Sequence, residues 1–155
     1  MERTLVLLKP DAVQRGLLGE IISRFERKGL KLVGMKMMKL DDALLDEHYS
    51  HLNHLPFFGE IKKFMMLAPV IAVCWEGVDC VQTVRALCGI TKARDAAPGT
   101  IRGDLGMSIQ ANLVHASDSV ETAANEVPRF FKDSELFNYD WMPLPYLYTG
   151  PERGA

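Results

Sequence analysis

The chain lacks the features that would assign it to several large classes of protein. Its three cysteines are odd in number and have no C-x-x-C spacing, so we expect neither a disulfide framework nor a zinc site. Reduced thiols of this kind point to the cytoplasm. The first apolar run ends at Pro10 and is too short for a signal peptide or a membrane span. The net charge of −2 gives no general attraction to nucleic acid or to membranes.

Two common nucleotide-binding motifs are also missing. There is no G-x-x-x-x-G-K-[ST] loop and no G-x-G-x-x-G, so the sequence supports neither P-loop nor dinucleotide-binding chemistry. The composition is otherwise ordinary for a globular protein, with 48% hydrophobic and 25% charged residues. We therefore expect a single domain over residues 1–155, large enough to bury a core. Any anion site must come from a local cluster of cationic side chains.

Hydrophobic patterning predicts four strands that alternate with helices. Continuous apolar runs predict strands over 4–8 and 70–75. A Met-rich stretch with lysines at its ends and middle predicts one over 31–40, and a short apolar stretch that stops on a histidine predicts one over 112–115. This order favours an α+β fold of the ferredoxin-like, split βαβ type, in which a four-stranded antiparallel sheet carries helices on one side. Residues 90–110 show no sustained periodicity, and a loop of that length inside a compact domain is usually functional.

One histidine stands out because it lies between the fourth strand and the next helix. The strand ends at His115, and Asp118 with Glu121 three residues later has the spacing of a helical capping box. We expect Pro128 to end that helix. A helix N-terminus favours anions, and a neutral imidazole is a competent nucleophile near pH 7 that can form a phosphohistidine. For an isolated histidine, a structural hydrogen-bonding role is the more common interpretation.

Three cations and a threonine fall in or near connections, where they can converge on a polyphosphate. Lys9 ends the first strand, and burying a lysine there is costly unless it has a partner or a ligand. Arg85 lies near the end of a predicted helix, and Thr91 and Arg102 lie in the long loop. No structural partner for Arg102 is evident. Arginine matches phosphate oxygens two at a time, whereas each of these charges taken singly is typical of a solvated surface.

Aromatic and histidine side chains between the second and third strands suggest two further sites. Phe57 or Phe58 can offer a ring on which a nucleobase stacks, a contact that hardly distinguishes between bases, and we expect at least one ring to lie in the core. His48, His51 and His54 recur every three residues, but each such step drifts by about 60° around a helix. The three histidines therefore cannot face one ion, and we expect no metal site there but an exposed helix end.

Four separated motifs together resemble the nucleoside diphosphate kinase family. In chain order they are Lys9-Pro10-Asp11 with Val13-Gln14-Arg15-Gly16, then Pro56-Phe57-Phe58, then Pro98-Gly99-Thr100-Ile101-Arg102-Gly103-Asp104, and finally Asn112-x-x-His115-Ala116-Ser117-Asp118-Ser119. The resemblance extends from about residue 3 to 139, and it leaves a C-terminal tail over 140–155 unmatched. Several motifs in the right order are far more specific than any one of them.

The resemblance implies a ping-pong transfer of the γ-phosphoryl group from a nucleoside triphosphate, with Mg²⁺, to a nucleoside diphosphate of almost any base. His115 matches the phosphorylated histidine of the family. A cytoplasmic homo-oligomer is implied, a hexamer or a tetramer. Ala93 replaces a proline common in the loop used for assembly, which also leaves a dimer open. Ala116 stands where many members have glycine. No membrane and no specific nucleic acid is expected as a partner.

The resemblance also implies roles for the other site residues. The side chains that hold the phosphates correspond to Arg85, Thr91 and Arg102, and those near the sugar 3′-hydroxyl correspond to Lys9 and Asn112. The active-site tyrosine corresponds to Tyr49, and the ring stacked on the base corresponds to Phe57, with apolar neighbours Ile61 and Ile109. The supporting hydrogen bonds around the histidine correspond to Ser117 and Glu126.

Two other functions would use parts of the same residue set. A non-catalytic regulator or nucleic-acid binder on the same scaffold would lack the nucleophile or a phosphate cation, or would present a broad basic face. A protein histidine phosphocarrier would need His115 but would not need Phe57, Arg85 and Arg102 arranged for a nucleotide. The sequence does not distinguish which imidazole nitrogen takes the phosphate.

Overall fold

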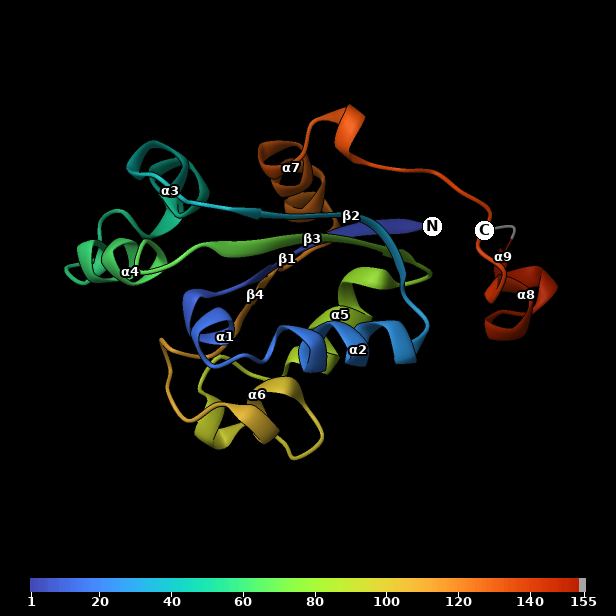
Figure 1. Cartoon of the computed structure of the whole chain (residues 1–155), viewed down its shortest axis with the longest axis horizontal. Coiled ribbons are helices and arrows are strands. Elements are labelled where there is room, and N and C mark those ends of the chain that lie inside the picture. The colour runs from blue at the N-terminus through green and yellow to red at the C-terminus, as the bar shows by residue number, and fades with distance from the viewer. Residues whose placement is uncertain (154–155) are drawn as a thin grey trace.

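A four-stranded antiparallel sheet forms the centre of the molecule in the computed structural model, which describes residues 1–153 (Figure 1). The strands are β1 (Glu2–Leu8), β2 (Lys31–Met38), β3 (Val70–Gly77) and β4 (Val114–Ala116). Their order across the sheet is β2-β3-β1-β4, and every neighbouring pair is antiparallel. This is the predicted ferredoxin-like arrangement, and the fold class is confirmed.

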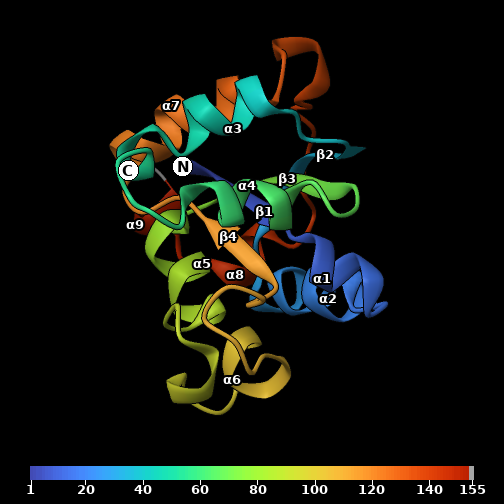
Figure 2. The same ribbon diagram turned by 90° about the vertical axis from the view of Figure 1, so that its left-hand side faces the viewer.

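Helices cover both faces of the sheet rather than one. On one face lie α1 (Pro10–Gln14), α2 (Leu18–Lys28), α5 (Cys80–Cys88) and α6 (Ile101–Leu105), and on the other lie α3 (Asp42–His48) and α7 (Val120–Phe130) (Figures 1 and 2). Residues of α4 (Phe58–Met65) pack into the same core cluster as α3 and α7. The expectation of helices on one side was therefore wrong.

The apolar run of β1 explains why both faces are covered. Successive side chains of a strand point to opposite faces, and every residue from Leu5 to Leu8 is fully buried. Val6 and Leu8 belong to the core under α2 and α5, whereas Leu5 and Leu7 belong to the core under α3 and α7. Each such side chain contributes about 1.5–3 kcal/mol by leaving water. The sheet is thus a rigid layer between two cores.

The start and the end of α7 differ from the sequence prediction. Ser119, not Asp118, caps the helix: its backbone is extended and its Oγ accepts a hydrogen bond from the N–H of Thr122 at 3.1 Å. Asp118 points instead to an arginine of the site described below. The helix also continues past Pro128 to Phe130, because a proline this close to the end removes only one hydrogen bond of the last turn.

The long segment over 90–110 contains a short helix that periodicity did not reveal. Thr100 caps α6, and its Oγ1 accepts a hydrogen bond from the N–H of Gly103 at 2.9 Å. Earlier in the segment, the N–H of Ala93 donates to the carbonyl of Ser108 at 3.4 Å. A proline at position 93 would have no N–H to donate. This hydrogen bond therefore joins the beginning of the segment to its end.

The C-terminal tail runs back along β2 (Figure 1). The N–H of Phe137 donates to the carbonyl of Val33 at 2.8 Å, and the hydroxyl of Tyr139 donates to the carbonyl of Leu32 at 2.6 Å. Beyond them lie α8 (Leu144–Leu147) and α9 (Gly150–Arg153). No helix within residues 1–153 has the length and apolar character needed to cross a membrane.

Candidate active site

One large cavity gathers the residues that the separate motifs had pointed to. It has a volume of about 1280 Å³, enough for a nucleotide, and it opens between α3, α4, α5 and β4. Eleven of the twelve predicted site residues line it, and Ser117 is buried behind it. Those eleven are Lys9, Tyr49, Phe57, Ile61, Arg85, Thr91, Arg102, Ile109, Asn112, His115 and Glu126.

A strained turn presents His115 to this cavity. Leu113 has a φ of 74°, and the N–H of Val114 donates to the carbonyl of Asn112 at 2.9 Å, which closes a γ-turn of the rare, unfavourable type. A residue outside the turn stabilises this strained conformation, because the N–H of Leu113 donates to the side chain of Asp11 at 3.0 Å. Non-glycine residues in such conformations cluster at functional sites. The turn leads directly into β4, where His115 pairs with β1.

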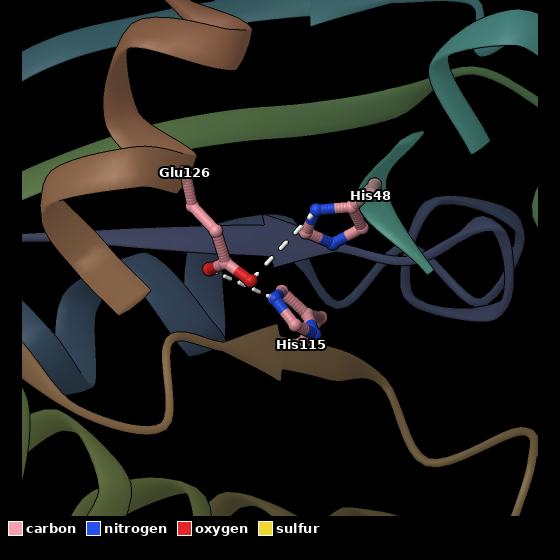
Figure 3. A group of neighbouring side chains, drawn as sticks. All are labelled: His48, His115 and Glu126. Atoms are coloured by element: carbon pink, nitrogen blue, oxygen red, sulfur yellow. Dashed lines mark hydrogen bonds and ion pairs between the residues drawn. The ribbon is translucent and has the colours of Figure 1, made fainter. Parts of the chain in front are cut away.

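The imidazole of His115 is anchored on one side by a carboxylate (Figure 3). Its Nε2 lies 3.3 Å from Oε2 of Glu126, and the hydroxyl of Ser117 donates to the same oxygen at 2.6 Å. Burial by itself would raise the pKa of Glu126, but the hydrogen bonds from His115 and Ser117 help to lower it to about 2. Glu126 is therefore a carboxylate at neutral pH, and it favours the tautomer that carries its proton on Nε2.

A second histidine, which the sequence analysis placed on an exposed helix end, is buried beside the first. The ring of His48 lies edge-on to that of His115, with 4.5 Å between centroids, and only 3% of the residue is exposed. Burial lowers the pKa of His48 to about 3, and so the ring is neutral. The expectation of exposure is correct for His51 and His54 but wrong for His48. Its position three residues after the buried Leu45 is the signal that would have placed it on the inner face of α3.

The same group offers the ligand types of a metal site. Within the described residues, His48, His115 and Glu126 bring their donor atoms to within 4.8 Å of one another. Two imidazoles and one carboxylate suit zinc better than Mg²⁺, which takes oxygen ligands. However, the guanidinium of Arg129 lies 3.3 Å from Nδ1 of His48 and is itself held by Glu47 at 3.0 Å. A cation therefore already occupies this nitrogen, and the geometry favours a hydrogen-bonded group over a metal site.

Lys9 and Asn112 form a buried polar pair at the inner end of the cavity. The ammonium of Lys9 donates to Oδ1 of Asn112 at 2.9 Å and to the carbonyl of Gln110. The amide of Asn112 donates to the carbonyls of Thr91 and Ile109, both at 2.9 Å. Burial lowers the pKa of Lys9 to about 8. This pair connects the end of β1 to Thr91 near the beginning of the long loop and to Ile109 and Gln110 at its end.

The two arginines of the cavity are held in different ways. Arg102, for which the sequence showed no partner, donates to three backbone carbonyls: Gly89 at 2.7 Å, Val114 at 2.6 Å and Asn112 at 3.3 Å. These partners were not evident from the sequence. Burial lowers the pKa of Arg102. Arg85 instead pairs with Asp118 at 2.7 Å in an exposed ion pair, which contributes little and which a phosphate can displace. Asp118 is thus a site residue that the sequence analysis had assigned to helix capping.

A hydrophobic slot opens at the outer end of the cavity. Phe57 is 51% exposed and Ile109 is 62% exposed, although both line the cavity. Phe58 packs against the core, as expected for one of the two neighbouring rings. The ring of Tyr49 lies 6.0 Å from that of His115 at the inner end, and burial raises its pKa. Phe57 and Ile109 therefore offer apolar surface to a ligand in the cavity.

Comparison with known proteins agrees with this geometry. A family model described as nucleoside diphosphate kinase matches residues 2–136. The chain belongs to the nucleoside diphosphate kinase family. A nucleoside diphosphate kinase from Parabacteroides distasonis is 60% identical over 152 residues, which cover 98% of this chain and 99% of the relative. Nucleoside diphosphate kinase 3 from Homo sapiens is 48% identical over 147 residues, covering 95% and 87%.

A solved structure extends the likeness to three dimensions. The halophilic nucleoside diphosphate kinase from Halobacterium salinarum, in complex with CDP, has a TM-score of 0.93 and 47% identity, and the match covers 95% of this chain and 98% of that one. Like the other nucleoside diphosphate kinases, this chain is a phosphotransferase that works through a phosphohistidine. Ala116, the residue that follows His115, is buried on β4.

Proposed function

We propose that His115 is the phosphorylated residue and that its Nδ1 takes the γ-phosphoryl group. The supporting observation is the contact between Nε2 and Glu126, which leaves the lone pair on Nδ1. Nδ1 attacks the γ-phosphorus, the bond from that phosphorus to the β,γ-bridging oxygen breaks, and the nucleoside diphosphate leaves with the electron pair. In the second half-reaction, a β-phosphate oxygen of another diphosphate attacks, the P–N bond breaks, and the lone pair returns to Nδ1.

The cations of the cavity neutralise the transferred group in this proposal. Arg85, Arg102 and Thr91 contact the phosphates, while Lys9 and Asn112 contact the region of the sugar 3′-hydroxyl. Their convergence on one cavity with His115 supports these roles. Phosphoryl transfer depends mainly on positioning and on charge stabilisation, which two guanidinium groups and an ammonium supply.

The slot at the outer end holds the base. Phe57 stacks on it, and Ile61 and Ile109 provide apolar contacts around it, while Tyr49 packs beside the reacting imidazole. Stacking hardly distinguishes between bases, and this supports transfer among purine and pyrimidine nucleotides alike. Ser117 acts through Glu126, since its hydroxyl holds the oxygen that faces His115.

Mg²⁺ enters on the nucleotide phosphates in this proposal and keeps several of its waters. The donor set beside His115, with two imidazole rings, does not fit Mg²⁺, which supports a metal carried by the substrate. We also propose a homo-oligomer, a hexamer or a tetramer, because β2 is an edge strand with Met35 and Met37 more than half exposed. Three buried free cysteines support a cytoplasmic location.

Transfer of label from [γ-³²P]ATP tests the proposal. We expect an acid-labile, alkali-stable label on the wild-type chain that any nucleoside diphosphate discharges, and no label on His115→Ala. His54→Ala, which changes an exposed histidine, serves as the matched control. Label that persists in His115→Ala would contradict the assignment. Label that no nucleoside diphosphate removes would instead favour a protein phosphocarrier.

A further inference from the structure

Gln110 connects the two walls of the slot that lies at the outer end of the cavity. Its side-chain Nε2 donates to the backbone carbonyl of Glu60 at 3.1 Å. Its own backbone carbonyl accepts a hydrogen bond from the ammonium of Lys9. One residue thus contacts the α4 wall through its side chain and the buried lysine through its main chain. Neither the motifs nor the family resemblance assigned it a role.

The bond to Glu60 acts at the place where the slot is formed. Glu60 lies in the first turn of α4, three residues after Phe57, and its N–H donates to the carbonyl of Phe57 at 3.1 Å. Ile109 is the chain neighbour of Gln110 on the opposite wall. Among the described residues, this is the one hydrogen bond between α4 and the 106–112 segment. It therefore links the helix that follows Phe57 to the segment that carries Ile109.

The 106–112 segment keeps its own shape without the Gln110 side chain. The hydroxyl of Ser108 accepts hydrogen bonds from the N–H groups of Gln110 and Ala111, at 3.1 and 3.2 Å. Asn112 ties the segment to Thr91 and to Lys9. The start of α4 has less support than its end, since residues 56, 57, 59 and 60 are all exposed whereas Met65 is fully buried. Loss of the Gln110 amide should then loosen α4 relative to the segment while leaving the segment folded.

We propose that Gln110 is a positioning residue that holds the base slot at its working width before a nucleotide arrives. This inference rests on the proposed function, because it concerns the same slot. A slot held open at the right width needs less ordering when the base enters, which strengthens the binding of every nucleotide. The phosphates and His115 lie beyond this bond, and the chemical step is independent of it.

Two substitutions and a donor without a base test the role. Gln110→Ala and Gln110→Glu both remove the donor, while both keep the backbone carbonyl that Lys9 uses. We expect the KM for ATP, GDP and CDP to rise about twofold to tenfold, the range that one lost hydrogen bond gives, with kcat within about twofold of wild type. Phosphorylation of His115 by phosphoramidate, which has neither base nor sugar, should proceed at the wild-type rate. Gln82→Ala, an exposed glutamine outside the cavity, is the matched control.

The opposite results are equally clear. Unchanged KM values in both variants would overturn the inference, and so would an equal loss of rate with phosphoramidate, because that result places the defect at His115. Should Gln110→Ala melt well below the wild type, Gln110→Glu, which is close to glutamine in size, decides the question. A wild-type chain that ATP cannot label would refute the proposed function instead, a result distinct from either of these.

Discussion

Nε2 of His115 and Oε2 of Glu126 lie 3.3 Å apart, and this contact assigns different tasks to the two nitrogens of one ring. The carboxylate keeps the proton on Nε2, so that the lone pair on Nδ1 is available. In the proposed reaction it also stabilises the positive charge that spreads over the ring when Nδ1 forms a bond to phosphorus. Glu126 comes from α7 and His115 from β4, and the sheet and helix together hold the pair in register.

Glu126→Gln should lower the rate of phosphohistidine formation by at least about tenfold, because it replaces the group that orients the reacting imidazole. The neutral amide fixes the ring less well and stabilises less charge, although it has nearly the same shape. Rapid quench of the label from ATP measures this step directly. Glu121→Gln, on the exposed face of the same helix, should be unaffected. An unchanged rate in Glu126→Gln would show that the contact has no part in transfer.

Arg102→Ala should reduce both activity and stability, because the guanidinium has a proposed role at the phosphates and also binds three backbone carbonyls. Removing one charge that stabilises the transition state is expected to cost about 3 kcal/mol, or roughly a hundredfold in kcat. Three backbone carbonyls also lose their donor, and the free energy of unfolding should fall by about 2–4 kcal/mol. Urea denaturation beside steady-state kinetics separates the two effects. Arg94→Ala, an exposed arginine in the same segment, is the control, and stability equal to wild type in Arg102→Ala would contradict the structural task.

These two predictions also show where sequence reasoning succeeded and where it did not. Strands such as β1 and β3 were predictable because an unbroken apolar run leaves few other solutions, and the cluster at His115 was predictable because its motifs resemble a family. The contacts of Arg102 were not, since its carbonyl partners depend on how three segments fold around it. The amino-acid sequence also does not show that Leu113 takes a positive φ, because the surrounding tertiary structure imposes this conformation.

The burial of His48 could be predicted from the sequence only in part. Helical spacing from Leu45 indicates the inner face, but three histidines in a row suggested an exposed end, and only the packing of α7 on α3 decides between them. The covering of both faces of the sheet is similar. The apolar run of β1 already implied it, yet the order of the elements alone suggested one side.

Phe57→Ala should weaken nucleotide binding by a similar factor for every base. A ring that stacks on a base contributes about 1–3 kcal/mol, so KM should rise roughly tenfold or more for ADP, GDP and CDP together. Phe57→Trp keeps a stacking surface and should stay near wild type. The measurement is KM across the set of diphosphates. A loss confined to one base would argue against simple stacking.

His48 makes the stability of the protein sensitive to acid. Burial lowers its pKa from the ordinary value of 6.5 to about 3, so that between these pH values the unfolded chain binds a proton that the folded chain does not. The free energy of unfolding should therefore fall as the pH drops from about 6.5 towards 3, by up to about 1.4 kcal/mol per pH unit from this residue. Urea denaturation at several pH values should show a shallower dependence in His48→Gln. An equal change in slope for the exposed His54→Gln would contradict this origin.

Lys9 should set the alkaline limit of activity. Burial lowers its pKa to about 8, so the ammonium is present below that pH and is progressively lost above it. Since kcat/KM reports the ionisation of the free enzyme, its value for nucleoside diphosphates should decline as the pH rises through about 8. In Lys9→Arg the guanidinium stays charged, and the decline should move to higher pH even if the absolute rate is lower. The profile of kcat/KM from pH 6 to 10 for both proteins is the measurement, and identical profiles would show that another group controls the alkaline limb.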